Sequence, residues 1–141
     1  MLNQVTLVGR SGKDVVVRTT ESGKKVASFT MATWVSYRDE SHESGWKTIT
    51  EWHNIVQWGE HVDKMAERMP KGTMVCVTGS IRTRSYTAES GQEKYITEVV
   101  GTTKVLKAGE KKEEKPKAKN EPDEPPYTKD DIMKIDDDMP F

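Results

Sequence analysis

The sequence predicts an all-β domain, a small five-stranded barrel with one short helix, followed by a disordered acidic C-terminal tail. Extended segments rich in β-branched and aromatic residues recur between Gly-containing turns over the first 107 residues. A helical spacing of apolar residues occurs once, after the third strand. After Ala108 the composition changes to Lys, Glu and Pro, with few apolar groups to bury.

Three strands are expected before residue 59. Leu2–Gly9 alternates loosely and ends on a glycine, and Val15–Arg18 continues it after a turn. Val26–Tyr37 alternates strictly, which predicts one face against a core and one face toward solvent or a ligand. The polar segment 38–46 is expected to be a hairpin loop, and Lys47–Trp58 returns as a strand.

The helix and the remaining strands follow in the next fifty residues. Apolar residues at helical spacing, ending before Pro70, predict a helix over 60–69. Strands are expected at 74–84 and 94–100, with a short closing segment at 104–107. One helix between the third and fourth strands is typical of the OB-fold barrel, although a β-sandwich shares many of these signals.

Charge is divided unevenly along the chain, whose net charge is −1. Residues 1–107 carry 15 Lys/Arg and 12 Asp/Glu, a net charge of +3, whereas the remainder carries 7 Lys and 11 Asp/Glu, a net charge of −4. Cys76 is the single cysteine, which excludes an intramolecular disulfide and a thiolate metal cluster. With no signal peptide or membrane-spanning apolar run, we expect a soluble cytoplasmic protein.

No pattern in the sequence indicates catalysis or a cofactor. His42, His53 and His61 are not spaced as metal ligands. The segment Gly9–Lys13 lacks the length and the ending of a phosphate-binding loop, and no serine lies in a nucleophile elbow. We therefore expect a protein that is not an enzyme and that has no metal or cofactor.

The segment Thr50–Gly59, TEWHNIVQWG, is the most informative stretch of the chain. Trp52 and Trp58 share one side of this strand, where they either fill a core or form a platform for flat ligands. Further aromatic and basic residues fall on the predicted strands or their ends, a combination that suits single-stranded nucleic acid, with generic core aromatics as the alternative. The aromatic residues are Trp34, Tyr37, Trp52, Trp58 and Tyr86, and the basic residues are Arg38, Lys47, Arg82, Arg84 and Lys94.

The last six residues form an acidic tip, after a linker at 108–135 that is expected to be disordered. Asp136, Asp137 and Asp138 precede Met139, Pro140 and Phe141. The tip is either a solvated acidic end or a docking peptide whose aromatic residue fills an apolar pocket while basic residues pair with its carboxylates. Nothing in the sequence fixes these carboxylates for a metal ion.

Several sequence blocks, in order, resemble the bacterial single-stranded DNA-binding protein (SSB) family, which has the OB-fold. The resemblance covers residues 3–107 and the last six residues. The blocks are NQVTLVG, TEWHNIVQWG, KGTMVCVTG, RTRSYT followed by SGQEKYITEVV, and the terminal DDDMPF.

The resemblance implies roles for individual residues. Bases are expected to stack on Tyr37, Trp52, Trp58 and Tyr86. Tyr37 and Tyr86 stand where the family commonly has tryptophan, and Trp58 where it commonly has phenylalanine, so stacking should survive these changes. His53 matches a position at the subunit interface of the family's homotetramer. Trp34 has no family role to transfer, and is either a further stacking surface or an oligomer contact.

The function that the resemblance implies is passive. The protein wraps and protects single-stranded DNA in replication, recombination and repair, and associates with the nucleoid. The resemblance implies that the acidic tip recruits partner proteins. The net charges of +3 and −4 on the two parts of the chain lead us to expect that the tip also competes weakly with DNA for the basic groove at rest. The alternative is an OB-fold adaptor that binds proteins, with incidental nucleic-acid binding.

Overall fold

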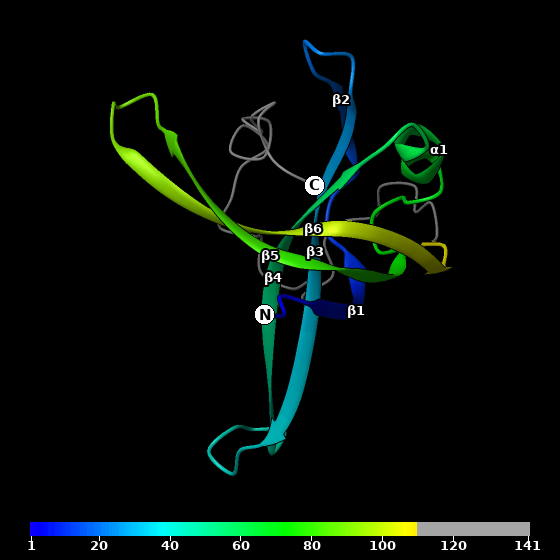
Figure 1. Ribbon diagram of the computed structural model, residues 1–141. Helices are drawn as coiled ribbons and strands as arrows, with labels where there is room; N and C mark the ends of the chain where they lie inside the picture. The colour runs from blue at the N-terminus through cyan, green and yellow to red at the C-terminus, as the bar shows by residue number, and fades with distance from the viewer. Residues whose placement is uncertain (110–141) are drawn as a thin grey trace.

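The computed structural model describes residues 1–109, which form six strands and one short helix (Figure 1). The helix α1 (Val62–Glu67) lies between the fourth and fifth strands. The strands are β1 (Val5–Ser11), β2 (Val16–Thr19), β3 (Lys25–Arg38), β4 (Trp46–Trp58), β5 (Met74–Thr87) and β6 (Glu93–Lys107). Both β1 and β2 pair with β3, so they are two parts of one interrupted strand and the barrel has the five strands predicted.

The sheet closes on itself to form the barrel. Its strand order is β1-β5-β6-β4-β3-β2, and the additional pairing of β1 with β3 joins the two ends. This pairing places Arg10 opposite Ala32 and Ser11 opposite Met31. Only β4 and β6 run parallel, and the other neighbours are antiparallel. This connectivity, with the helix between the third and fourth barrel strands, is that of the OB-fold.

Odd-numbered residues of the strands form the barrel core, because side chains alternate faces along a strand. The helix segment contributes Val62, Met65 and Met69 to the same cluster, so α1 packs on the core. The helix is shorter than the predicted 60–69. The strand residues of the core are Ala27, Phe29, Met31, Ile55, Val75, Val77 and Val99.

A second apolar cluster buries the opposite face of β3. Val26, Val56 and Val100 pack together there, with Trp58 packed against them. Ser28 and Thr30 on the same face are also buried. The face of β3 that was predicted to meet solvent or a ligand is therefore buried between Val26 and Ala32 in the single chain, where Val56 and Val100 from two other strands pack with Val26.

One long strand, β6, replaces the two short segments expected at 94–100 and 104–107. Gly101 lies between them and faces Gly79 of β5. A Cβ at either position would collide with backbone of the partner strand, the Thr78 carbonyl oxygen for Gly101 and the Val100 carbonyl oxygen for Gly79. The two glycines therefore allow a close approach of two continuous strands.

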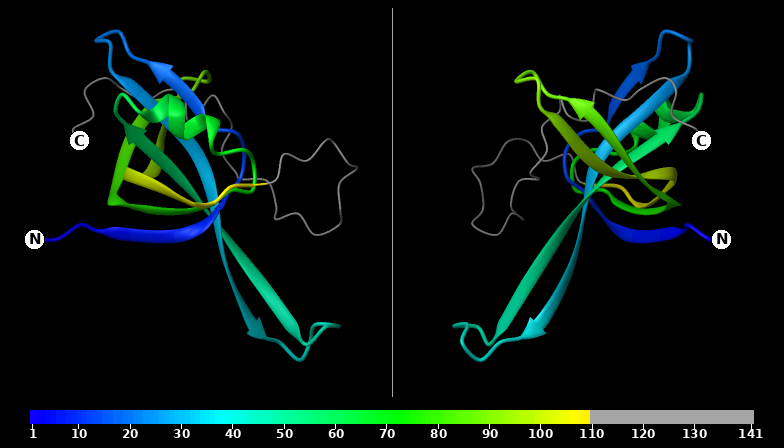
Figure 2. Two further views of the ribbon diagram at one scale, coloured as in Figure 1. Left: turned by 90° about the vertical axis from the view of Figure 1, so that its right-hand side faces the viewer. Right: turned by 60° about the vertical axis from the view of Figure 1, so that its left-hand side comes forward.

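The hairpin of β3 and β4 extends well beyond the barrel, as Figure 2 shows. The two strands stay in unbroken register, from Val26 opposite Trp58 to Arg38 opposite Trp46. Residues become half-buried at Thr33 and exposed from Trp34 onward, which marks where the ribbon leaves the barrel. We call the projecting part, residues 33–51, the arm.

Candidate nucleic-acid interface

Most of the predicted site residues lie on the outer face of the barrel, the face opposite the core. Cross-strand partners in β3–β4, β4–β6 and β5–β6 have the same parity, except at the register shift where Met74 opposes Lys107, and directly opposed residues share a face. Away from that shift, even-numbered residues of these four strands therefore belong to the outer face. Of the predicted stacking and basic residues, this face holds Arg38, Trp52, Trp58, Arg82, Arg84, Tyr86 and Lys94.

Trp52 is half-buried on the outer face and packs over the backbone of Gly12. A Cβ on Gly12 would lie 2.5 Å from Trp52 Cζ3 and 2.8 Å from Thr30 Oγ1, so only glycine fits beneath the ring. Among residues 1–109, no hydrogen-bond acceptor meets the buried Trp52 Nε1. The backbone at Gly12 fixes the position of the indole, which is neither part of the barrel core nor fully exposed.

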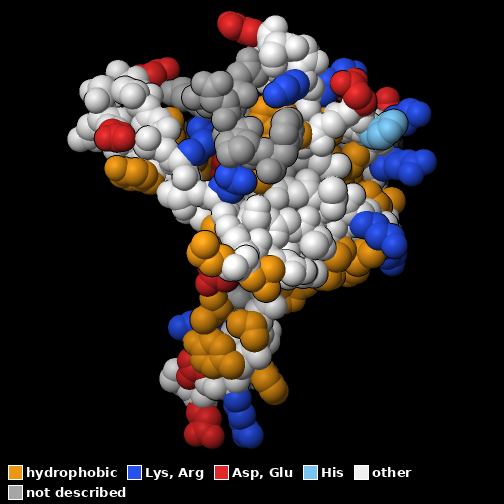
Figure 3. All heavy atoms as spheres, viewed as in Figure 1, with side chains coloured by type: hydrophobic (Ala, Val, Ile, Leu, Met, Phe, Trp, Pro, Cys, Tyr) orange, Lys and Arg blue, Asp and Glu red, His pale blue; other side chains and the backbone are white. Residues whose placement is uncertain are grey.

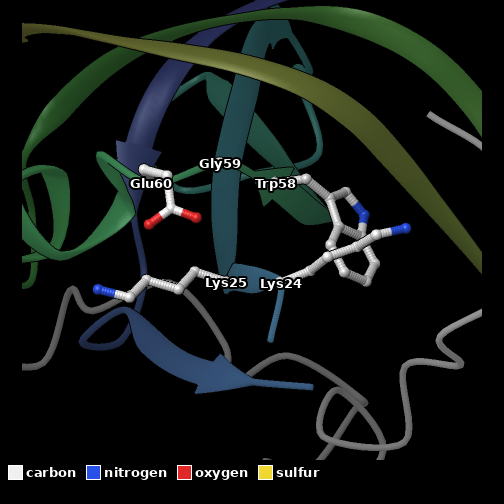
Figure 4. Close-up of a pocket in the computed structure, with 5 residues that line it drawn as sticks. All are labelled: Lys24, Lys25, Trp58, Gly59 and Glu60. Atoms are coloured by element: carbon white, nitrogen blue, oxygen red, sulfur yellow. The ribbon is translucent and has the colours of Figure 1, made fainter. Parts of the chain in front are cut away.

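Trp58 lies at the other end of the strand β4, also half-buried, against the second apolar cluster. Its indole lines an open pocket of about 220 Å³ (Figure 4). Lys24, Lys25, Gly59 and Glu60 form the rest of the lining. The pocket thus combines a flat apolar surface with two ammonium groups and one carboxylate.

Tyr37 does not share a face with the other predicted stacking residues. It is an odd-numbered residue of the arm, opposite Lys47, and is 40% exposed. Trp52 belongs to the other face of the same ribbon. A nucleic-acid strand that stacks on both rings must therefore pass around an edge of the arm.

Tyr86 and Lys94 face each other near the end of the β5–β6 hairpin. Tyr86 is half-buried and Lys94 is exposed. Figure 1 shows this hairpin projecting from the barrel in a direction different from that of the arm. The predicted stacking residues are therefore distributed over the barrel wall and two separate hairpins.

Arg84 has a carboxylate partner that the sequence did not indicate. Its Nε donates to Glu98 Oε2 at 3.1 Å and its Nη2 donates to Glu98 Oε1 at 3.0 Å. The Glu98 side chain is fully buried and the Arg84 side chain is only 11% exposed. Forked pairs of this kind hold a guanidinium in one geometry, which leaves less of Arg84 available to a phosphate.

His53 lies at the base of the arm, on the same face as the core residue Ile55. His53 Nε2 and Thr33 Oγ1 share a hydrogen bond of 2.7 Å. Burial lowers the pKa of His53, and the Glu51 carboxylate partly opposes this effect. The ring is half-buried, a position compatible with the predicted subunit contact and equally with a role within one chain.

Two exposed indoles on the arm belong to the outer face and complete its aromatic surface. Trp34 is 51% exposed and Trp46 is 57% exposed. Figure 3 shows hydrophobic side chains gathered along the arm, with charged groups at its tip. The sequence left Trp34 without an assigned role, and Trp46 fell in the predicted loop, where no face could be assigned. The alternation of β4, extended by one residue, would have placed Trp46 on the same side as Trp52 and Trp58.

Two further observations bear on other classes of function. Among residues 1–109, no helix is long and apolar enough to cross a membrane. In the same part of the chain, no three His, Cys, Asp or Glu side chains are grouped as metal ligands. The predicted docking tip, residues 136–141, and the predicted linker from residue 110 onward lie outside the described residues.

Comparison with known proteins identifies relatives over the barrel. The model of the single-strand binding protein family matches residues 2–106. Single-stranded DNA-binding proteins of Rickettsia felis and Rickettsia typhi are each 42% identical over 100 residues, which is 70% of this chain and 65% of the relative. The match thus spans slightly less than two thirds of those relatives.

A solved structure gives the same result. The structure described as the Plasmodium falciparum SSB complex with ssDNA has a TM-score of 0.64 and 32% sequence identity, covering 75% of this chain and 96% of the other. This chain therefore belongs to the single-strand binding protein family, as a bacterial-type member with an OB-fold.

Proposed function

We propose that this chain binds and protects single-stranded DNA on the outer face of its barrel and that it has no catalytic activity. The observation that carries the proposal is the outer face, which presents the indoles of Trp52 and Trp58. Lys24 lines the pocket beside Trp58, and Arg38, Arg82 and Lys94 belong to the same face. Base stacking on aromatic rings is worth about 1–3 kcal/mol per base, and nearby cations neutralise the phosphates. Membership in the family and the names of its relatives support the same ligand.

Tyr37 and Tyr86 are proposed as the outlying stacking residues. Each lies on a hairpin and beside a lysine, Lys47 for Tyr37 and Lys94 for Tyr86. DNA that reaches both must follow a curved path, because the two hairpins leave the barrel in different directions (Figure 2). Arg38 and Arg82 supply further cations along this path.

The biological roles proposed are DNA replication, recombination and repair in the cytoplasm, in association with the nucleoid. Residues 1–107 are the binding domain, and strand β6 ends at Lys107. Residues 108–135 are proposed as a disordered linker and residues 136–141 as the tip that recruits partner proteins. Residues 1–107 have a net charge of +3 and residues 108–141 a net charge of −4. This difference supports weak competition between the tip and DNA for the basic surface of the barrel.

A homotetramer is the proposed assembly, with His53 at a contact between subunits. His53 is half-buried in one chain, so a partner subunit could cover the remainder of its ring. Sedimentation velocity of the full chain and of a His53→Ala variant tests this proposal. A wild-type protein that sediments as a monomer contradicts the assembly, and an unchanged tetramer in the variant contradicts the role of His53.

Titration with labelled oligo-dT tests the proposed function. We expect binding that quenches tryptophan fluorescence, that weakens as salt rises, and that is much weaker for duplex of the same length. Equal affinities for duplex and single-stranded DNA would show that the protein contacts phosphates without stacking on bases. No binding at low salt would contradict the proposal.

An OB-fold adaptor that binds proteins is the second candidate. Exposed apolar residues away from the arm favour it, among them Val8 on β1 at 55% exposed and Leu106 on β6 at 49% exposed. An adaptor would show weak, strongly salt-dependent binding of oligo-dT without quenching. The same titration therefore separates the two functions.

A further inference from the structure

The arm presents different side chains on its two faces. Its outer face continues the barrel surface that carries Trp52, and its other face continues from His53. The arm residues of the outer face are Trp34, Ser36, Arg38, Trp46, Thr48 and Thr50, and those of the other face are Thr33, Val35, Tyr37, Lys47, Ile49 and Glu51.

Trp34 and Trp46 are more exposed than the indoles of the barrel wall. They are 51% and 57% exposed, whereas Trp52 and Trp58 are half-buried. A two-stranded ribbon has no core of its own, so the arm cannot cover these rings. Two large exposed aromatic side chains on one face mark an interaction surface.

The spacing of the rings continues the surface that begins at Trp52. Ala32 faces Trp52 and Trp34 faces Thr50, so Trp34 and Trp52 are diagonal neighbours, about 7–8 Å apart at their backbones. Farther out, Ser36 Oγ and Thr48 Oγ1 share a hydrogen bond of 2.8 Å. Trp46 follows, and from Trp52 to Trp46 the strand spans about 20 Å at about 3.4 Å per residue.

The polar groups between the rings indicate the chemistry of the ligand. Arg38 lies directly opposite Trp46, and the Ser36–Thr48 hydroxyl pair separates Trp46 from Trp34. A large contiguous apolar patch is a common mark of a surface that binds a protein. Alternating flat rings, hydroxyls and a cation instead match a chain of flat bases joined by phosphates.

The charge of the outer face agrees with an anionic ligand. None of the six outer-face residues of the arm is acidic, whereas Glu51 lies on the other face. The connecting loop holds Asp39, Glu40 and Glu43 beyond the last strand pair. Ser41 donates to Asp39 Oδ1 from its hydroxyl at 2.6 Å and from its backbone N–H at 3.0 Å, so that carboxylate is engaged within the loop.

We propose that Trp34 and Trp46 stack bases of single-stranded DNA and extend the binding surface from Trp52 to the tip of the arm. This inference rests on the proposed function and assigns two binding residues to it. The three indoles Trp52, Trp34 and Trp46 then form one continuous track along the outer face of the ribbon.

Single substitutions in the full chain test the track. We expect Trp34→Ala and Trp46→Ala each to weaken binding of an oligo-dT of about 16 nucleotides by about 5- to 150-fold, the loss of one stacked base. Trp34→Phe and Trp46→Phe should restore most of the affinity, because a phenyl ring also stacks. Fluorescence anisotropy of a labelled oligonucleotide is the measurement, because it does not depend on the tryptophans removed.

Val35→Ala and Ile49→Ala are the matched controls, since they shorten exposed apolar side chains on the other face of the same ribbon. They should leave the affinity within about twofold of the wild type. Melting temperatures of all variants check that the barrel is intact. Wild-type affinity in both Trp→Ala variants, or equal losses in the controls, overturns the inference.

The test also separates this inference from the proposed function. If the full chain binds oligo-dT and Trp52→Ala weakens it while Trp34→Ala and Trp46→Ala do not, only the extended track is wrong. If the full chain does not bind oligo-dT, the proposed function fails and the track fails with it. Smaller assemblies of the Trp→Ala variants in sedimentation, with unchanged affinity, would identify the arm as a contact between copies and overturn the inference.

Discussion

Arg84 of β5 and Glu98 of β6 are diagonal neighbours across the two strands and share two hydrogen bonds, of 3.1 and 3.0 Å, around a fully buried carboxylate. Removal of one partner leaves the other charge buried without compensation. We expect Arg84→Met to lower the free energy of unfolding by about 3–5 kcal/mol, as measured by urea denaturation. The double variant Arg84→Met, Glu98→Leu should recover much of this loss.

The exposed pair of Lys25 and Asp63 provides the control, since surface pairs contribute little. Asp63→Asn should leave the urea midpoint nearly unchanged. Arg84 was predicted as a DNA contact, and that role stays a prediction. Unchanged stability of Arg84→Met together with weaker DNA binding would favour the phosphate contact over the structural role.

Trp52→Ala and Trp58→Ala should each weaken binding of oligo-dT by about 1–3 kcal/mol, measured by anisotropy. Trp58→Ala should also lower the melting temperature, because Trp58 packs against Val26, Val56 and Val100. Trp58→Phe is the matched variant that keeps both the packing and the stacking ring. Unfolding of Trp52→Ala would show that Trp52 is primarily a packing residue.

Gly12→Ala should displace the Trp52 indole, because the new Cβ would lie 2.5 Å from Trp52 Cζ3. Overpacking of this kind costs about 1–3 kcal/mol of stability. A changed tryptophan emission spectrum and weaker binding of oligo-dT are the expected readouts. Gly23→Ala, at a turn glycine with φ of 85° and open space around it, should lower stability without affecting Trp52 emission.

His53 should make folding stability depend on pH. Burial lowers its pKa below the usual 6.5, so the unfolded chain takes up a proton at a higher pH than the folded chain. The contribution of His53 to the free energy of unfolding is therefore fully present above pH 6.5. It is lost as the pH falls from 6.5 through the lowered pKa of the folded state. Urea midpoints of the wild type and of His53→Gln between pH 5 and pH 8 should diverge in this window, with the variant less dependent on pH.

Deletion of residues 136–141 should preserve or raise the affinity for oligo-dT and abolish binding of partner proteins. The tip carries three aspartates that would compete with DNA for the basic body. The effect should be largest at low salt, where long-range charge is least screened. Loss of DNA binding on deletion would contradict a tip that competes with DNA.

The sequence predicted the barrel well, because strand alternation and the single helix are local signals. The odd-numbered residues of β3, such as Phe29 and Met31, are in the core as their alternation indicates. The burial of Val26 on the opposite face could not be predicted, because it depends on Val56 and Val100 from two other strands. Likewise, nothing local showed that Gly101 faces Gly79 and lets β6 continue as one strand.

The candidate site was predicted as a set of residue types, not as an arrangement. Trp52 and Trp58 were expected on one side of β4, which is confirmed. That Tyr37 lies on the other face of the ribbon follows from the pairing of β3 with β4, which sequence periodicity does not give. The pairing of Arg84 with Glu98 is likewise a cross-strand contact between residues 14 positions apart.

The unbroken register of β3 and β4 also determines which changes in chain length the arm tolerates. Phe29 and Ile55 face each other in the core and fix the pairing of every residue farther out. One residue inserted into β4 between Ile55 and Trp46 would turn Trp46 to the other face, because side chains alternate. Residues inserted into the loop between Arg38 and Trp46 leave both faces as they are. Related chains should therefore vary the length of this loop and keep the length of the strands that support it.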